Sequence, residues 1–513
     1  MLESLSYSVS IHLGASSLSL LIIENLNGHE TELEYLDHAV PFARDIFRYG
    51  RVKRDTIERA VDILDGYIKT LSEYGLQPSD VQNAALTNIA NEAKNQHVIL
   101  SRLQISSGIT FHTLTSGGMT RLIFEKIRRR QIEASFTNIG KTLAIHVGPG
   151  NTRVLMLNNG RVERFSTYRL GTHRTAEQLR QHYSSGKDYL QYIRKQCAQV
   201  DAIKYDFKKE GIENFILIGL EIQLVSEHLG DGTDFKKGIE SYSQFLDLAA
   251  EQAEEERVVN YALDYHSEDG FLPALQINYS LLHAFSEPKY WVPKTDYSRG
   301  ILKDLAITKA SSSTHLEPEI LHACRFLAQK YDADPNHYEH ICVLVTELFE
   351  KTKELHELSD WDLVLLKAAT IVHEIGGYIS PRMHHKHSYY LINNSEIFGL
   401  DDEHRKIVAL IARYHRQSSP KTTHKEYMSL TKEVRITISK LSSLLRIADA
   451  LDISQQQKIK RISVQLNRDT LKITTPDISD LNLERMTLKS KGDLFEELFG
   501  LDIKLEHTYD PLY

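Results

Sequence analysis

Ten of the 24 histidines lie between residues 337 and 424, so the side chains that could do chemistry are concentrated in one part of the chain. There an adjacent His373-Glu374 pair ends an apolar run, and residues 384–387 have the sequence HHKH. Histidines gather for metal ligation, for proton transfer or as neutral polar packing. A metal site and a structural or anion-binding role are both open at this point.

A second candidate site comes from a sequence that recurs. The stretches IHLGASS at 11–17 and IHVGPGN at 145–151 each place a histidine between apolar residues and before a glycine turn. The recurrence predicts two related α/β lobes with facing turns, and a cleft between such lobes is a natural ligand site. Two unrelated hairpins are the alternative.

The elements that must position these residues follow from hydrophobic periodicity and turn signals. In the first half we predict strands in 7–23 around the turn 14–17, then in 31–40, 81–86, 111–114, 142–157 and 214–219, with a helix at 54–74. In the second half we predict helices at 320–330, 338–353, 360–375, 401–415 and 431–451, followed by a hairpin at 461–475, a helical segment at 481–499 and a strand at 501–507. Residues 310–314 (ASSST) form the clearest linker. We therefore predict four domains: 1–130, 131–308, 309–458 and 459–513.

Composition narrows the classes of protein. The apolar content of 41% and the charged content of 25% are ordinary for a soluble globular protein. The net charge of -8 argues against a nucleic-acid binder. No run approaches the roughly 20 apolar residues of a membrane span, and the first residues do not resemble a signal peptide. The three cysteines are widely spaced, which is a cytoplasmic pattern without a disulfide framework.

Four stretches together resemble one family: TNIANEAKN at 87–95, HHKHSYYLINNSEIFGL at 384–400, RYHR at 413–416 and LLRIADALDIS at 444–454. They are similar to the exopolyphosphatase/guanosine pentaphosphate phosphohydrolase (Ppx/GppA) family over nearly the whole chain. The resemblance implies an α/β + α fold class. It comprises two actin-like (ribonuclease H-like) lobes, a helical domain resembling HD phosphohydrolases, and a small α+β C-terminal domain.

The family resemblance also implies a reaction. In this family the cleft between the lobes removes terminal phosphate from polyphosphate or guanosine pentaphosphate with magnesium. Backbone N–H groups in two glycine turns cradle the phosphate, and carboxylates hold the metal. A glutamate after a Ser-Gly turn acts as general base. The partners implied are polyphosphate or a guanosine alarmone, with no membrane or nucleic acid, and the protein is expected to be a homodimer.

This chain keeps the family's turns but lacks its carboxylates. The two aspartate positions are His12 and His146, and the glutamate that closes the second turn is Arg153. The general-base position falls on Gly118 or Met119. Magnesium prefers oxygen ligands, and losing a general base alone costs roughly 10²–10⁴ in rate. We therefore expect impaired hydrolysis and no magnesium in this cleft.

Three states of the altered cleft remain open. His12 and His146 could bind a softer metal such as zinc or manganese. They could instead, with Arg153, hold an anionic phosphate chain without metal, or simply pack in a retired site. The residues predicted to contact phosphate in the two turns are Gly14, Ser16, Ser17, Gly148, Gly150 and Asn151.

The helical domain offers another centre. An HD phosphohydrolase places a histidine, a His-Asp pair and a later aspartate on successive helices, and His340, His373, Glu374 and Asp449 follow that order. A divalent metal is a candidate cofactor on these four residues. His384, His385, His387 and His415 are candidates for further ligands or phosphate contacts, and the cations that suit phosphate are Lys386, Arg413 and Arg416.

Three functions fit this sequence. The first is an exopolyphosphatase relative that binds polyphosphate or guanosine penta/tetraphosphate at a degenerate site. The second is a metal-dependent phosphohydrolase acting at the HD-like centre. The third is a conventional exopolyphosphatase whose carboxylates come from elsewhere in the fold.

Overall fold

The chain divides into two compact units, residues 1–310 and 311–513. The computed structural model describes residues 5–27, 29–134, 140–180, 187–196, 198–229, 239–263, 265–285, 289–293, 297–307, 316–416 and 419–508. The predicted linker at 310–314 and the predicted boundary at 308/309 lie outside these residues. Within the described part, no helix combines the length and the apolar character that crossing a bilayer would require.

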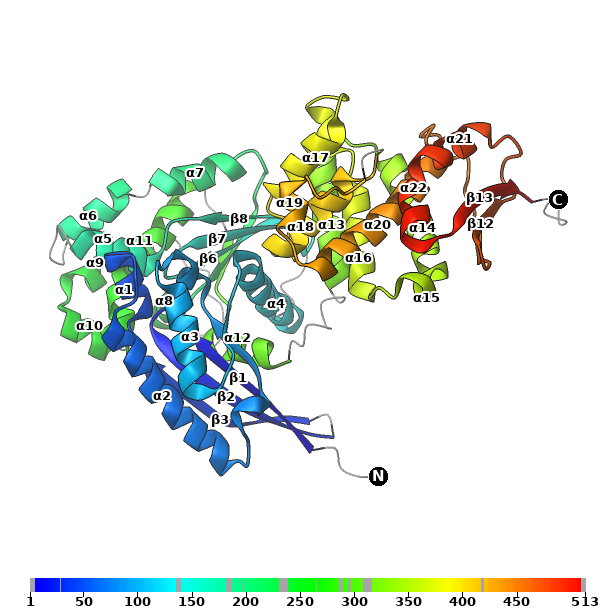
Figure 1. Ribbon diagram of the computed structural model, residues 1–513. Helices are drawn as coiled ribbons and strands as arrows, with labels where there is room; N and C mark the ends of the chain where they lie inside the picture. Colours follow the sequence, from blue (N-terminus) through cyan, green and yellow to red (C-terminus); the bar gives the residue numbers. More distant parts are fainter. Residues whose placement is uncertain are drawn as a thin grey trace. The chain divides into compact units, whose positions relative to one another are not determined.

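The first unit begins with a five-stranded sheet of order β3-β2-β1-β4-β5. Its strands are β1 (Leu5–Leu13), β2 (Ser17–Leu26), β3 (His29–Ala39), β4 (Val81–Leu86) and β5 (His112–Thr113). The helices of this part are α1 (Phe42–Tyr49), α2 (Arg54–Glu73), α3 (Gln96–Ser107) and α4 (Ser116–Ala134) (Figure 1). These bounds confirm the strands predicted within 7–23, 31–40 and 81–86 and the helix predicted at 54–74.

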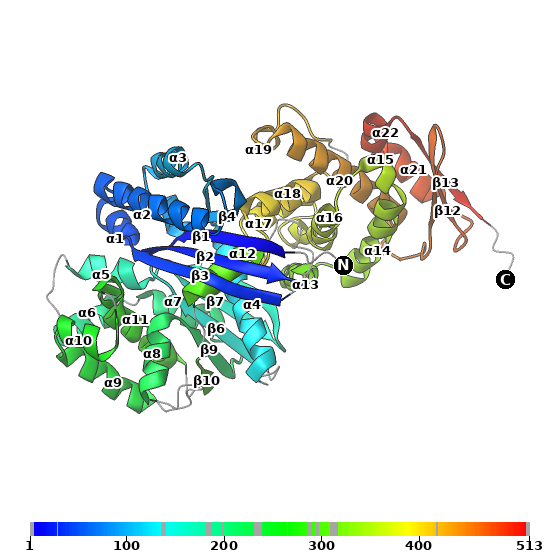
Figure 2. The ribbon, with the colours of Figure 1, turned by 90° about the horizontal axis from the view of Figure 1, so that it is seen from below.

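Both faces of this sheet are covered, which explains why β2 is an almost unbroken apolar run. Leu20 and Ile22 belong to the core that includes Leu64 of α2. The alternate residues Leu21 and Ile23 pack instead with Leu302 of α12 (Tyr297–Ile307). Figure 2 shows α2 and α12 on opposite faces of β1–β3. Thus α12, which the division at 130/131 assigns to the second lobe, covers the first sheet.

The second sheet has the order β10-β9-β6-β7-β8, which repeats the connectivity of the first. Its strands are β6 (Lys141–Val147), β7 (Thr152–Asn158), β8 (Arg161–Tyr168), β9 (Asn214–Ile218) and β10 (Lys289–Trp291). In each sheet a meander of three antiparallel strands precedes two parallel strands. This is the strand order of the actin-like fold. The accompanying helices are α5 (Thr172–Arg180), α6 (Lys187–Gln196), α7 (Ala198–Phe207), α8 (Leu220–Leu229), α9 (Ile239–Glu251), α10 (Glu254–Asn260) and α11 (Tyr265–Ala284).

The second unit is built around two apolar helices, α16 and α20. Its helices before the tail are α13 (Glu317–Lys330), α14 (Pro335–Lys351), α15 (Lys353–His356), α16 (Asp360–Val372), α17 (His384–Asn393), α18 (Asp402–Arg413), α19 (Lys425–Met428) and α20 (Lys432–Leu451). The side chain of Ser359 caps α16 by accepting from the backbone N–H of Asp362, and that of Thr431 caps α20 in the same way. The five helices predicted here are confirmed to within a few residues at their ends.

The tail adds a small sheet to the same unit. It contains β11 (Ser463–Leu466), β12 (Thr470–Thr475) and β13 (Asp502–His507), in that order, with α21 (Asn482–Lys491) and α22 (Asp493–Phe499) between the last two strands. The fully buried Arg446 of α20 donates to the carbonyl oxygens of Ser490 and Lys491, which fixes the end of α21 against α20. The tail thus contributes residues to the surroundings of Asp449.

Candidate functional site

The two recurring turns have the same backbone geometry. The N–H of Gly14 donates to the carbonyl oxygen of Ser17 at 2.8 Å, and that of Gly148 donates to Asn151 at 3.0 Å. The carbonyl oxygens of Ser16 and Gly150 accept bonds from donors further along the chain. Because these carbonyl oxygens already accept hydrogen bonds within the protein, the turns are suited to bind an anion through their N–H groups.

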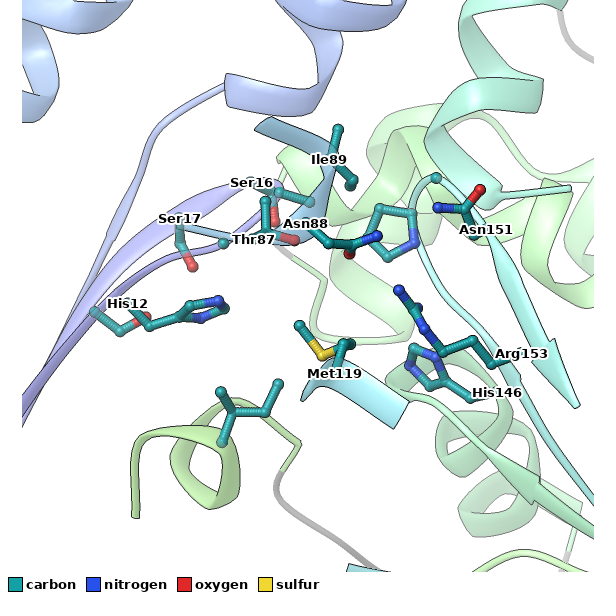
Figure 3. Close-up of a pocket in the computed structure, with 16 residues that line it drawn as sticks. His12, Ser16, Ser17, Thr87, Asn88, Ile89, Met119, His146, Asn151 and Arg153 are labelled. Carbon is teal, nitrogen blue, oxygen red and sulfur yellow. The ribbon is translucent and has the colours of Figure 1, made fainter. Parts of the chain in front are cut away.

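A pocket of about 120 Å³ lies between the two turns, and we call it the two-turn pocket. Figure 3 shows His12 and His146 on opposite sides of it, with Met119 between them. The residues that line it are His12, Gly14, Ala15, Ser16, Ser17, Ser19, Thr87, Asn88, Ile89, Met119, His146, Pro149, Gly150, Asn151, Arg153 and Ile301. The predicted residues of the cleft therefore meet here, apart from Gly118 and Gly148.

Strand pairing positions His146 and Arg153 on one side of the two-turn pocket. His146 on β6 lies directly opposite Arg153 on β7 in the antiparallel ladder, and Arg153 is only 3% exposed. Gly148 must be small, because an added Cβ would lie 2.8 Å from the Cε1 of His146. Of the two positions proposed for the lost general base, Met119 lines the pocket and Gly118 does not. A carboxylate at 119 would therefore face the space that a ligand occupies.

The lining residues do not fit magnesium. Magnesium requires several oxygen ligands and is bound in proteins chiefly through carboxylates. Among the described residues that line the two-turn pocket there is neither an aspartate nor a glutamate. The donors present are imidazole, guanidinium, hydroxyl and amide groups, which together favour an anion over a hard cation.

Glu221, in the first turn of α8, does not line the two-turn pocket. Burial raises the pKa of its carboxyl to about 7 from an ordinary value of 4.5. The folded state therefore holds the proton of Glu221 more tightly than the unfolded state does. The stability that the protonated carboxyl contributes is fully present below pH 4.5 and is lost as the pH rises through 7. Because Glu221 is partly exposed, we expect the loss to be about 2 kcal/mol.

The raised pKa of Glu221 can be tested by measuring unfolding at two pH values. Glu221→Gln should leave the urea midpoint of the first unit almost unchanged at pH 4.5 and raise it clearly at pH 8, where the parent protein carries a carboxylate. Equal effects of the substitution at the two pH values would contradict a raised pKa.

In the helical unit, three side chains from three helices converge. His337 lies in the first turn of α14, His373 directly follows α16, and Asp449 lies in the last turn of α20. One ligand atom from each lies within 4.8 Å of the other two. We call these residues the helical centre. His340, the histidine predicted from the sequence, is not part of it. Its place is taken by His337, one helical turn earlier.

Opposite charges surround His337. Its Nδ1 lies 2.9 Å from Asp452 Oδ2, and its Nε2 lies 3.6 Å from Asp449 Oδ1 and 3.9 Å from Glu374 Oε2. Burial lowers the pKa of His337, but Asp449 and Asp452 outweigh it and raise the pKa to about 10. Any metal ion that binds Nε2 must displace the proton held there.

Asp449 is paired on its other side. Burial would raise the pKa of this carboxyl, but the ammonium group of Lys491 on α21 and then His337 hold it well below its usual range. Lys491 is itself almost buried. Asp449 is thus a carboxylate whose two oxygens face two cationic side chains.

His373 supplies the strongest sign of a ligand site. It is fully buried, and its Nδ1 lies 2.6 Å from the carbonyl oxygen of Thr370, which can only accept. The proton therefore sits on Nδ1, and Nε2 keeps a lone pair. Within the described part of the chain Nε2 has no hydrogen-bond partner. A buried acceptor without a donor, beside a second imidazole and a carboxylate, fits a divalent transition metal.

The other predicted residues are dispersed around this centre. Glu374 and Arg416 line the adjoining cavity together with His415, whereas His387 and Lys386 do not. Arg413 is committed to Glu426 at 3.5 Å and to the ring of Tyr389. Burial, followed by the charges of His384, Arg416, Lys386 and Arg413, lowers the pKa of His385 to about 4.

Comparison with known proteins agrees with the sequence motifs. Residues 322–496 match the family model described as Ppx/GppA phosphatase, domain III. The guanosine-5'-triphosphate,3'-diphosphate pyrophosphatases of Aeromonas hydrophila and Pseudoalteromonas atlantica are 19% and 22% identical to the chain. The alignments cover 91% and 88% of this chain and 92% and 87% of those proteins.

A solved structure of an exopolyphosphatase from Cytophaga hutchinsonii matches 59% of this chain and 98% of its own, with 16% identity and a TM-score of 0.49. The resemblance of this chain to the Ppx/GppA family is therefore confirmed, with the family-model match falling on residues 322–496.

Proposed function

We propose that this protein binds the phosphate chain of polyphosphate or of guanosine penta/tetraphosphate in the two-turn pocket and hydrolyses it poorly or not at all. The observation that carries the proposal is a pocket with two glycine turns, a buried arginine and no carboxylate among its described lining residues. Such a site keeps the groups that bind phosphate and lacks those that hold magnesium and activate water.

The relatives support the choice of ligand class. Those named above are called guanosine-5'-triphosphate,3'-diphosphate pyrophosphatases, and the solved structure is called an exopolyphosphatase. The ligands implied by these names share a chain of phosphates linked by anhydride bonds. A terminal phosphate of such a chain carries the charge that Arg153 and the turn N–H groups would receive.

A direct binding experiment tests the proposal. Arg153→Gln should weaken binding of fluorescent long-chain polyphosphate, measured with a metal chelator present, by about tenfold to a hundredfold, because a charge-assisted hydrogen bond is lost. Binding by the parent protein should also weaken as salt is added.

Arg54→Gln is the matched control, because Arg54 is an arginine of the same unit whose side chain is 89% exposed. Thermal unfolding of Arg153→Gln should be measured in parallel, since the residue is buried. Equal polyphosphate affinity in a folded Arg153→Gln variant would contradict the proposal.

A second candidate function is a metal-dependent phosphohydrolase at the helical centre, favoured by the orphaned Nε2 of His373 beside His337 and Asp449. A divalent cation bound there would lower the pKa of a water molecule and neutralise charge on a phosphate oxygen. His337, His373 and Asp449 would hold this cation. Lys491 and Arg416 in the adjoining cavity would contact phosphate oxygens.

Elemental analysis tests this second function. The purified full chain is expected to carry zinc, manganese or iron, and His373→Ala should lose most of it while polyphosphate binding at the two-turn pocket stays unchanged. His340→Ala is the control, because His340 lies on the same helix as His337 but outside the helical centre. Equal metal content in the parent, His373→Ala and His340→Ala proteins would exclude the helical centre as the metal-binding site.

A further inference from the structure

The cavity beside the helical centre contains a second pair of imidazole nitrogens. His384 begins α17, and His415 lies two residues after the end of α18. Their Nε2 atoms are 3.0 Å apart, and their rings lie within 19° of parallel. Both residues line a cavity of about 300 Å³ that Glu374, Asp449 and Lys491 also line.

The tautomers of this pair follow from the backbone. The Nδ1 of His415 lies 2.5 Å from the carbonyl oxygen of Ala412, and the Nδ1 of His384 lies 3.3 Å from that of Pro381. Carbonyl oxygens only accept, so each Nδ1 carries the hydrogen. Each neutral ring then has its lone pair on Nε2, and the two lone pairs face each other.

Two lone pairs at this distance repel unless a positive centre lies between them. A shared proton would supply one positive charge, but the carboxylates of Glu374 and Asp449 line the same cavity. A divalent cation is the alternative. Metal–nitrogen bonds of about 2.0–2.1 Å span a separation of 3.0 Å when the two ligands are adjacent in the coordination sphere.

Glu374 connects this pair to the helical centre. Its Oε2 lies 3.9 Å from His337 Nε2 on one side, and its carboxylate lines the cavity with His384 and His415 on the other. The rings of His373 and His415 are themselves only 4.9 Å apart, centre to centre. The two groups of ligands are therefore neighbours, with one carboxylate near both.

We propose that the helical unit binds two divalent cations side by side, the first on the helical centre and the second on His384 and His415, with the Glu374 carboxylate shared between them. The proposal deepens the second candidate function and rests on it. Glutamate in place of the aspartate of an HD pair extends the carboxylate by one methylene, and Glu374 lines the cavity that His384 and His415 also line.

Two adjacent cations define a class of ligand. They bind two oxygens of one phosphate group and neutralise its charge. Arg416 and Lys491 line the same cavity and provide further donors for phosphate oxygens. The ligand class is therefore a phosphate ester or phosphoanhydride small enough for this cavity.

Metal stoichiometry tests the proposal without any activity assay. The full chain is stripped with a chelator, reloaded with Mn²⁺, freed of excess metal and examined by elemental analysis and electron paramagnetic resonance. The parent protein should bind two equivalents and show the signal of exchange-coupled manganese. His384→Ala should bind one equivalent and show an uncoupled signal.

His385→Ala is the matched control, because His385 is the next residue and does not line the cavity. It should keep two equivalents. One equivalent in the parent that is lost in His373→Ala would overturn the two-cation proposal and leave a single-metal centre standing. The absence of bound manganese in the parent would overturn both, and two equivalents in His384→Ala would remove the second position from these histidines.

Discussion

Magnesium-dependent release of orthophosphate from long-chain polyphosphate is expected to be slower by roughly 10³-fold or more than in a Ppx/GppA enzyme that keeps its carboxylates. In the proposed function Met119, which lines the pocket, stands in place of the general base, and its thioether cannot accept a proton from water. In the proposed function His12 and His146 stand in place of the two metal-binding aspartates and offer nitrogen where magnesium requires oxygen. Phosphate release measured beside an active relative, with and without magnesium, checks this expectation.

Two sets of variants distinguish a two-turn pocket that has lost hydrolysis from one that hydrolyses phosphate with the residues now present. His12→Ala and His146→Ala should leave any residual phosphate release unchanged, because neither histidine takes part in it. His12→Asp combined with His146→Asp and Met119→Glu should raise magnesium-dependent release by at least about tenfold, since it returns the metal ligands and the base together. Vigorous release by the parent protein that requires magnesium and disappears in His146→Ala would contradict the proposed function.

The two-turn pocket could be predicted from the sequence because its residues lie at the ends of strands with strong local signals. The apolar alternation before Gly14 and Gly148 fixes two hairpins, and the shared residue order predicts that the hairpins are equivalent. Hydrogen bonds of the same kind in both turns confirm that equivalence. A choice between Gly118 and Met119 required coordinates, because adjacent residues in a helix point in different directions.

His337 could have been found by helical periodicity. On α14 the buried residues Ile341, Leu344 and Leu348 follow it at spacings of four, seven and eleven, so His337 continues the core-facing stripe. His340 is partly exposed and lies with the exposed Val343 on another face. The order of histidines and carboxylates along the chain fits either residue, but the position on the helix fits only His337.

Lys491 could not have been predicted as a partner of Asp449. The two residues are 42 positions apart, and the contact depends on how α21 packs on α20. Arg446 contributes to that packing, because its buried guanidinium donates to backbone carbonyl groups of α21. Local sequence carries no signal for a tertiary contact of this kind.

Gly376→Ala is expected to destabilise the helical unit by about 3 kcal/mol or more and to abolish binding of the second cation. Gly376 lies in the tight 3₁₀ turn Ile375–Tyr378, where its N–H donates to Ser388 Oγ at 2.9 Å. Ser388 Oγ in turn donates to the carbonyl oxygen of His373 at 2.7 Å. An added Cβ would fall well inside the van der Waals radii of the His384 carbonyl oxygen and the Ser388 backbone nitrogen.

Because both of these atoms belong to the backbone of α17, no side chain can rotate to relieve the overlap, and the first turn of that helix must move. His384 then leaves its position opposite His415, while His337, His373 and Asp449 lie outside α17. Gly377→Ala provides the control, since its added Cβ meets no atom within 4 Å. Urea unfolding and manganese stoichiometry of the two variants should differ sharply, and similar behaviour of both would show that the close packing of α17 on this turn does not set the position of His384.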